Sequence, residues 1–318
     1  MWEVFGWMAK KFLVLGRAGM DLYADPPGAR IEEAKGFVAA LGGSAANIAV
    51  GISRLGDHAD LVSAVSDDAV GRYALNELKN YGVGSQHVAT VAGAWRNSLA
   101  VVETRNENCQ SVIYRNGAAD FQIDEQNIKT IPYSDYDYFI VTGTALAEEP
   151  SRSATFLAMQ LAAKAGLVLI IDLDYRPYSW VSREDAANTY KRAVEMCGVI
   201  IGNDEEFAVM GQTLDDVKLI TAKMIVYKMG ALGSVTVQSG AISQVGVFKV
   251  KALKPTGAGD SFMAGFVTGI AQGLPVEQAV RRGSAAAAIV VTRVGCAPAM
   301  PTEIELNTFL VNHAHSAL

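Results

Sequence analysis

The segment Lys254-Pro255-Thr256-Gly257-Ala258-Gly259-Asp260 combines residue types that can bind an anion and accept a proton. Pro255 has no N–H for a strand, so a strand before it must end there. The small residues at 257–259 allow a tight turn with outward N–H groups. The apolar spacing of residues 262–270 predicts that a helix follows. Unpaired N–H groups at the start of a helix favour negative charge, so the segment predicts an anion site.

Asp260 has two interpretations at this position. An Asp in the first turn of a helix often only caps unpaired N–H groups. A carboxylate beside a bound phosphate can instead act as a base that takes the proton of an attacking hydroxyl. The residues around Asp260 leave both interpretations open.

The composition is that of a globular protein that can bury a large core: 318 residues, half of them apolar. The net charge is 27 − 33 = −6 and there is no basic run, so nucleic acid is not an expected partner. The cysteines, Cys109, Cys197 and Cys296, are few and far apart, which indicates a reducing compartment. No apolar stretch approaches the roughly 20 residues that span a bilayer. We expect a cytoplasmic protein that does not bind a membrane, with residues 1–11 as a short N-terminal extension.

The elements that position these residues follow an α/β pattern. Apolar strand patterns alternate with helical ones from residue 138 onward, which predicts a mostly parallel sheet covered by helices. Strands are expected at 12–16, 59–65, 138–141, 167–171, 199–201 and 224–227, and helices at 151–164, 183–197, 283–291 and 302–315. Right-handed crossovers bring the carboxyl ends of such strands to one edge, where ligands bind. Asp172 and the segment Asn203-Asp204-Glu205-Glu206 lie at that edge.

Two motifs in this order resemble the ribokinase-like (PfkB) carbohydrate kinases: Gly257-Ala258-Gly259-Asp260 after a strand, and Gly42-Gly43-Ser44-Ala45-Ala46-Asn47 near the N-terminus. The resemblance runs from about Phe12 to Pro301. It implies a three-layer α/β/α kinase domain over residues 12–318. It also implies a small β-sheet lid formed by about residues 22–38 and 97–115, whose free face is commonly a homodimer surface.

The resemblance also implies site residues. In the catalytic group, the amides of Gly257, Ala258 and Gly259 stabilise the transferred γ-phosphoryl group of ATP, and Asp260 is the base. Sugar-binding residues are expected at Asp21, Gly42, Gly43, Asn47, Arg17, Arg115, Asp172 and Arg176. ATP-binding residues are expected at Asn203, Glu206, Lys228, Gly230, Gly233, Gly257, Gly259 and Ser284, with Mg²⁺ held by Glu206 through water. Several of these residues have simpler interpretations, as helix caps (Asn47, Asn203, Glu206), a plain turn (Gly230, Gly233), close helix packing (Ser284) or a solvated charge (Arg115).

Three segments resemble the branch of the family that phosphorylates 5-dehydro-2-deoxygluconate in inositol catabolism. They are Gly16-Arg17-Ala18 with Asp21-Leu22, Asp172-Leu173-Asp174-Tyr175-Arg176-Pro177 with Trp180, and Tyr114-Arg115-Asn116. An acidic sugar needs cationic partners, which Arg17, Arg115 and Arg176 can supply. Kinases of 2-keto-3-deoxygluconate, fructose or ribose are the alternatives. A nicotinamide-dependent oxidoreductase is disfavoured because Gly-x-Gly-x-x-Gly is absent, and a non-catalytic sensor because Asp260 is present.

The chain departs from the family at Lys254-Pro255. Many ribokinase-like enzymes have Asp-Thr there, and the Asp helps to hold an activating potassium ion. A protonated lysine cannot ligate a metal, so Lys254 either supports the same loop with its own charge or points to solvent. Both possibilities predict an activity that does not depend on potassium.

Overall fold

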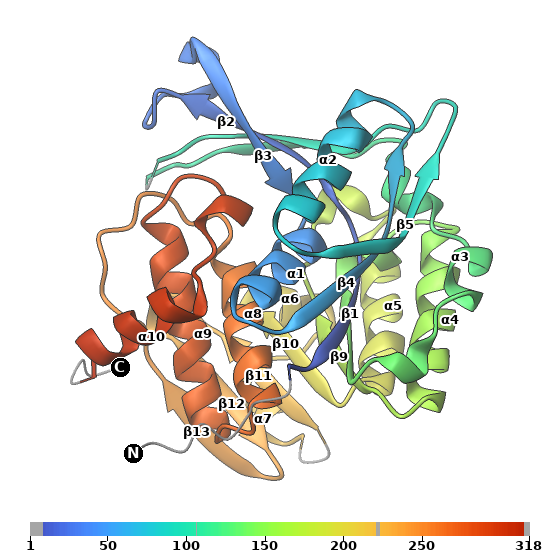
Figure 1. Cartoon of the computed structure of the whole chain (residues 1–318). Helices are drawn as coiled ribbons and strands as arrows, with labels where there is room; N and C mark the ends of the chain where they lie inside the picture. The colour runs from blue at the N-terminus through green and yellow to red at the C-terminus, as the bar shows by residue number, and fades with distance from the viewer. Residues whose placement is uncertain (1–8, 106, 221–222, 315–318) are drawn as a thin grey trace.

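The computed structural model describes residues 9–105, 107–220 and 223–314. Within them, nine strands form a large sheet in the spatial order β13-β12-β11-β10-β9-β8-β1-β4-β5 (Figure 1). Along the chain they are β1 (Lys11–Leu15), β4 (His58–Ser66), β5 (Gly84–Val91), β8 (Tyr138–Thr142), β9 (Val168–Asp172), β10 (Val199–Asn203), β11 (Met224–Lys228), β12 (Ser234–Gln238) and β13 (Ala241–Val245). Every neighbouring pair from β11 to β5 is parallel, and β12 is antiparallel to both of its neighbours. The mostly parallel sheet expected from the sequence is confirmed.

Helices cover both faces of this sheet (Figure 1). One layer contains α1 (Ser44–Arg54), α2 (Ala69–Asn80), α8 (Ala258–Ala271), α9 (Val276–Val291) and α10 (Glu303–Asn312). The other contains α3 (Glu125–Lys129), α4 (Ser151–Lys164), α5 (Arg183–Met196), α6 (Asp204–Val209) and α7 (Leu214–Lys218). Short 3₁₀ helices lie at Ile31–Glu33, Ala119–Gln122, Tyr133–Asp135, Gly143–Leu146, Pro177–Ser179, Gly230–Leu232 and Ala297–Ala299.

The central strand β1 shows why the fold needs three layers. Phe12 and Val14 pack into the core beneath α1 and α8, whereas Leu13 and Leu15 pack into the core beneath α4 and α5. All four side chains are fully buried. A strand that is buried on both faces has a continuous run of apolar residues, as Phe12 to Leu15 does.

A second sheet lies above the carboxyl ends of the central strands, at the top of Figure 1. Its order is β3-β2-β6-β7, with β2 (Gly19–Asp25), β3 (Gly36–Gly42), β6 (Ser98–Val102) and β7 (Ser111–Tyr114). The first two strands extend beyond the expected segment 22–38 at both ends. Residue 106, between β6 and β7 in the chain, lies outside the described residues. The role of this small sheet as a lid stays a prediction.

Some elements differ from the expectation. Helix α9 begins at Val276 and not at 283, because its first turns carry exposed polar residues that hide the apolar periodicity. Strand β5 was not expected, since it is a half-buried edge strand with several polar residues. The expected 1–11 extension falls mostly outside the described residues, and β1 begins at Lys11. In the described ranges, no helix has both the length and the apolar character to cross a bilayer; a cytoplasmic location stays a prediction.

Candidate active site

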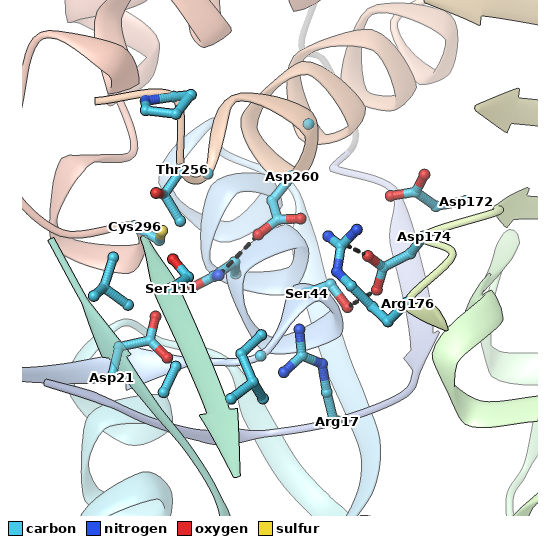
Figure 2. Close-up of a pocket in the computed structure, with 18 of the residues that line it drawn as sticks. Arg17, Asp21, Ser44, Ser111, Asp172, Asp174, Arg176, Thr256, Asp260 and Cys296 are labelled. Atoms are coloured by element: carbon cyan, nitrogen blue, oxygen red, sulfur yellow. Dashed lines mark hydrogen bonds and ion pairs between the residues drawn. The ribbon is translucent and has the colours of Figure 1, made fainter. Parts of the chain in front are cut away.

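A pocket of about 450 Å³ lies between the carboxyl ends of the central strands, the start of α8 and the small sheet (Figure 2). The chain reaches it from several directions, because β1 leads through Arg17 into β2, and β3 leads through Gly43 into α1. The expected site residues that line it are Arg17, Asp21, Gly43, Asn47, Asp172, Arg176, Asn203, Glu206, Lys228, Gly257, Gly259 and Asp260. The structure thus brings most of the expected residues together.

The start of α8 has the features of an anion cradle. Gly257 adopts a φ of +85°, a left-handed conformation that favours glycine. No hydrogen bond from the described part of the chain occupies the backbone N–H groups of Gly257, Gly259 and Asp260. A Cβ on Gly259 would approach only the Lys228 Nζ, at 3.7 Å, so the space in front of Gly259 is open and faces a cation. Free N–H groups, the helix dipole and an ammonium group together fit a phosphate.

Asp260 lies on the first turn of α8 and points into the pocket (Figure 2). Asn47 Nδ2 donates a hydrogen bond to Asp260 Oδ2 (2.8 Å). No backbone N–H of the described residues donates to this carboxylate, so Asp260 does not cap the helix. Burial, then the charge of Asp174, raises the pKa of Asp260 to about 6, although the Asn47 hydrogen bond lowers it. The carboxylate is therefore ionised at neutral pH and more basic than an exposed Asp.

Asp21 lies on β2, on the side of the pocket opposite Asp260 (Figure 2). The Tyr23 hydroxyl donates a hydrogen bond to Asp21 Oδ2 (3.1 Å). Burial raises the pKa of Asp21 to about 6, against the opposing charge of Arg17. Asp21 can therefore accept hydrogen bonds from sugar hydroxyls while it is ionised.

Gly42 and Gly43 were expected to let a ligand approach the backbone, and the structure gives a different reason for them. A Cβ on Gly42 would lie 2.0 Å from Asp21 Oδ1, and one on Gly43 would lie 2.4 Å from the Arg17 carbonyl oxygen. The two glycines therefore make room for neighbouring protein atoms. Gly43 still lines the pocket, whereas Gly42 does not.

Arg17 is a buried cation without a partner among the described residues. Arg17 is only 8% exposed, and its guanidinium group points into the pocket (Figure 2). Its Nε has no hydrogen-bond partner, and none of the residues in 9–105, 107–220 and 223–314 forms an ion pair or hydrogen bond with its side chain. An unpaired buried charge is costly, so this site favours an anionic ligand group.

Arg176 and Asp174 form an ion pair on the neighbouring wall, with Arg176 NH2 2.7 Å from Asp174 Oδ1. Asp174 Oδ2 also accepts hydrogen bonds from Ser44 Oγ (2.6 Å) and Thr144 Oγ1 (3.1 Å). Although burial alone raises the pKa of Asp174, the charges of Arg176 and Arg17 and these hydrogen bonds lower it below the usual value. The positive charge of Arg176 is thus largely balanced by the protein, in contrast to that of Arg17.

The remaining wall contains the residues expected to contact ATP. Asn203 and Glu206 cap α6 reciprocally: the Asn203 N–H donates to Glu206 Oε2 (2.7 Å), and the Glu206 N–H donates to Asn203 Oδ1 (2.8 Å). Both residues also line the pocket, so the helix cap and the ligand wall coincide. Lys228 Nζ lies 3.7 Å from Asp172 Oδ1. Burial raises the pKa of Asp172 to about 7, against the opposing charge of Lys228.

The other expected residues do not line the pocket: Gly42, Arg115, Ala258, Gly230, Gly233 and Ser284. Arg115 is buried and bound by the protein itself. Its NH2 pairs with Asp120 Oδ2 (2.5 Å) and donates to the Thr144 carbonyl (3.0 Å), and its guanidinium stacks on the Phe121 ring. The Ala258 N–H donates to the Pro255 carbonyl (3.3 Å). The geometry therefore favours neither Arg115 as a sugar contact nor the Ala258 amide as part of the cradle.

Lining residues that were not singled out as site residues include Ser44, Asp174 and Tyr178. The small sheet also contributes Ala100, Val102, Ser111 and Ile113, with Cys109 just before β7, and the C-terminal segment contributes Cys296. The sequence did hold a signal for Asp174, because this second acidic residue lies two positions after Asp172, at the end of β9. The sequence held no such signal for the residues of the small sheet, because a strand with alternating apolar and polar residues does not show which face will cover a pocket.

Lys254 does not point to solvent. Its side chain is fully buried, and its Nζ donates a hydrogen bond to the Thr256 carbonyl oxygen. Of the two possibilities left by the sequence, only the one in which Lys254 supports the loop agrees with this position.

The site combines a basic carboxylate with an anion cradle at the strand ends of a three-layer α/β fold, which suits phosphoryl transfer to a hydroxyl. Comparisons with known proteins agree. A family model described as pfkB family carbohydrate kinase matches residues 9–303. The chain therefore belongs to the pfkB family of carbohydrate kinases.

Two curated relatives are similar over nearly the whole chain. The 5-dehydro-2-deoxygluconokinase of Geobacillus kaustophilus is 37% identical, covering 96% of this chain and 95% of the relative. That of Photobacterium profundum is 39% identical, covering 94% of each chain. Among solved structures, a fructokinase variant from Vibrio cholerae O395, with fructose, ADP and potassium ion bound, superposes with a TM-score of 0.84 at 25% identity, covering 95% of this chain and 98% of the other.

Proposed function

We propose that this protein transfers the γ-phosphoryl group of ATP to a primary hydroxyl of 5-dehydro-2-deoxygluconate. Arg17 carries the substrate assignment, because it is a buried cation in the pocket that holds Asp260 and has no ionic partner among the described residues. A carboxylate on the sugar would neutralise this charge, whereas a neutral sugar would leave it unpaired. The two curated relatives with this activity in their names support the same substrate.

The reaction follows from the positions of Asp260 and the cradle. The sugar hydroxyl gives its proton to Asp260, and its oxygen forms a bond to the γ-phosphorus while the bond to the β-phosphate oxygen breaks and ADP leaves. The free N–H groups of Gly257 and Gly259, with the Lys228 ammonium, stabilise the charge on the transferred group. Asn47 holds the Asp260 carboxylate in place through its hydrogen bond.

Mg²⁺, when bound with ATP, neutralises charge on the phosphates. Glu206 fits this ion because it is 5% exposed, lines the pocket, and uses Oε2 in the α6 cap. Its other oxygen receives no hydrogen bond within the described ranges. Magnesium keeps much of its water, so we propose that Glu206 holds it through water.

An ATP-consumption assay tests the proposal with 5-dehydro-2-deoxygluconate, 2-keto-3-deoxygluconate, fructose and ribose as acceptors. We expect the highest kcat/KM for 5-dehydro-2-deoxygluconate and lower values for the neutral sugars. Equal or higher kcat/KM for fructose or ribose would contradict the acidic substrate. If no acceptor caused ATP consumption but ligands still bound, the protein would be a sensor.

We further propose a homodimer through the outer face of the small sheet. In the register of β6 and β7, Leu99 lies opposite Tyr114 and Val101 opposite Val112. These residues face away from Ala100 and Ile113, which line the pocket. Tyr114 is 59% exposed and Val112 41% exposed, and an open apolar sheet face needs cover.

The dimer predicts that the unmodified protein sediments with twice the mass of one chain. Lysine at both 112 and 114 (V112K with Y114K) is expected to give monomers without unfolding, because the charges would meet across the interface. Ile242→Lys, on the exposed edge strand β13, is the control and is expected to leave the dimer intact. A monomeric mass for the unmodified protein at every concentration would contradict the proposal.

Rates are expected to be equal in sodium and potassium buffers of matched ionic strength. The reason is the buried ammonium of Lys254, which repels a cation from the loop before α8. Initial rates across both salts measure this. Activation of several-fold by potassium would show that a cation binds there despite Lys254.

A further inference from the structure

Lys254 is a fully buried cation that the proposed chemistry does not use. Its side chain is 0% exposed. No carboxylate of the described residues lies within 4 Å of its Nζ. Burial lowers the pKa of Lys254, whereas Cys296, Asp260 and Asp21 oppose this shift. Among the described residues, the ammonium group makes one hydrogen bond, to the Thr256 carbonyl oxygen. A buried ammonium with a single backbone partner is costly, so its effect on that backbone needs explanation.

The Thr256 carbonyl and the Gly257 N–H belong to the same peptide group. This peptide is trans, since the cis bonds of the described chain precede Pro26 and Pro150. In a planar trans peptide the C=O and N–H bonds point in opposite directions. The ammonium that holds the Thr256 carbonyl therefore turns the Gly257 N–H away from Lys254. That N–H has no partner within the described ranges, and Gly257 lines the pocket.

The alternative orientation of this peptide is accessible to the chain. Glycine adopts either sign of φ at little cost, so Gly257 alone does not fix the peptide plane. A flipped peptide would present the Thr256 carbonyl oxygen to the phosphate and would replace a donor by a negative dipole. The Lys254 hydrogen bond opposes this flip.

We propose that Lys254 is a positioning residue, whose ammonium fixes the Thr256–Gly257 peptide so that the Gly257 N–H faces the transferred phosphoryl group. The proposal rests on the proposed function of the same pocket. The Gly257 N–H is most important when charge develops on the phosphoryl group. Misdirecting this N–H by removing the Lys254 ammonium therefore lowers kcat more than it changes the KM of the sugar.

The test compares Lys254→Met with Lys223→Met. Lys223 is a matched control, because its Nζ also donates to backbone carbonyls, those of Glu195 (2.9 Å) and Cys197 (2.6 Å), and it does not line the pocket. We expect Lys254→Met to lower kcat by about 10–100-fold, approaching the loss of one anion-hole donor, with the KM of the sugar changed less than about twofold. Lys223→Met is expected to change only the melting temperature. Rates are compared with the unmodified protein on whichever acceptor it uses best, so an error in the sugar assignment leaves this test intact.

Chemical rescue gives a second readout that a purely structural role would not move. In Lys254→Ala, added ethylammonium is expected to restore part of kcat, whereas tetramethylammonium at the same ionic strength, which has no N–H, is not. An unchanged kcat in Lys254→Met, or an equal increase in the kcat of Lys254→Ala with either ammonium ion, would overturn the proposal. If Lys254→Met did not fold, the kcat of Lys254→Ala without added ethylammonium would take its place, since alanine also lacks the N–H donor. Failure of both to fold would also overturn it, since Lys254 would then be needed for stability.

Discussion

Asp260→Asn is expected to lower turnover by about 10²–10⁴-fold, because an amide cannot take the proton of the sugar hydroxyl. Asn has the size of Asp and can still accept the hydrogen bond from Asn47 Nδ2. ATP affinity and melting temperature should therefore barely change. Steady-state rates, calorimetric ATP titration and thermal melts of the two proteins measure these three quantities.

A control variant on another helix distinguishes the two possible roles of Asp260, as a helix cap or as a base. Asp68 caps α2 by accepting from the N–H groups of Val70 and Gly71, so Asp68→Ala should lose about 0.5–2 kcal/mol of stability without losing turnover. Asp260→Asn should instead lose turnover and keep its stability. Unchanged turnover in Asp260→Asn would show that the carboxylate is not the base.

The pH dependence gives an independent check on Asp260. Its pKa, raised by burial to about 6, means that the proton-accepting form predominates above pH 6. The rate should fall as the pH decreases through about 6, since protonated Asp260 cannot accept another proton. The residual rate of Asp260→Asn should lack the inflection that Asp260 causes. Asp21 has a similar pKa, so any contribution of Asp21 to the pH dependence of the rate would remain in Asp260→Asn.

Local signals predicted the start of α8 well, because the chemistry of that turn lies within a few residues. Gly257 is required there both by its left-handed φ and by Cys296, whose Sγ would lie 2.8 Å from a Cβ. The first reason can be read from the sequence pattern. The second comes from a residue far along the chain and appears only in the folded structure.

The buried arginines show where sequence reasoning ends. Arg17 and Arg115 were both assigned to the sugar from the family resemblance and from their positive charge. The fold shows that Asp120 neutralises Arg115 and that the Thr144 carbonyl accepts a hydrogen bond from it, while Arg17 is left without a partner among the described residues. Asp120 lies only five residues from Arg115, so the sequence did contain a nearby carboxylate that could pair with this arginine.

Gly42 shows a similar limit. A glycine before a helix suggests room for a ligand, and sequence alone does not show which atoms fill that room. In the fold it is the Asp21 carboxylate, carried there by the pairing of β2 with β3, in which Asp21 lies opposite Ala40 and Gly19 opposite Gly42. The register of two strands therefore decides a role that residue types left open.

Arg17→Met is expected to lower kcat/KM for 5-dehydro-2-deoxygluconate by about 10–100-fold. A hydrogen bond to a charged group contributes about 1.5–3 kcal/mol, and about 1.4 kcal/mol corresponds to a factor of ten. Methionine keeps much of the apolar length of the side chain and removes the charge. Since a neutral sugar has no carboxylate to lose, kcat/KM for fructose should stay the same or rise. The measurement is the ratio of kcat/KM for the acid to that for fructose.

Arg115→Met is the matched control, because it removes a guanidinium that is equally buried but bound by Asp120 outside the pocket. It should leave the acid-to-fructose ratio unchanged, and it should lower stability by about 3–5 kcal/mol, since one charge of a buried pair remains alone. A fall in the ratio for Arg115→Met and none for Arg17→Met would reverse the assignment. A fall for neither would mean that the sugar carboxylate contacts Arg176 instead. That outcome would require Arg176 to exchange its partner, because Asp174 already lies 2.7 Å from its NH2.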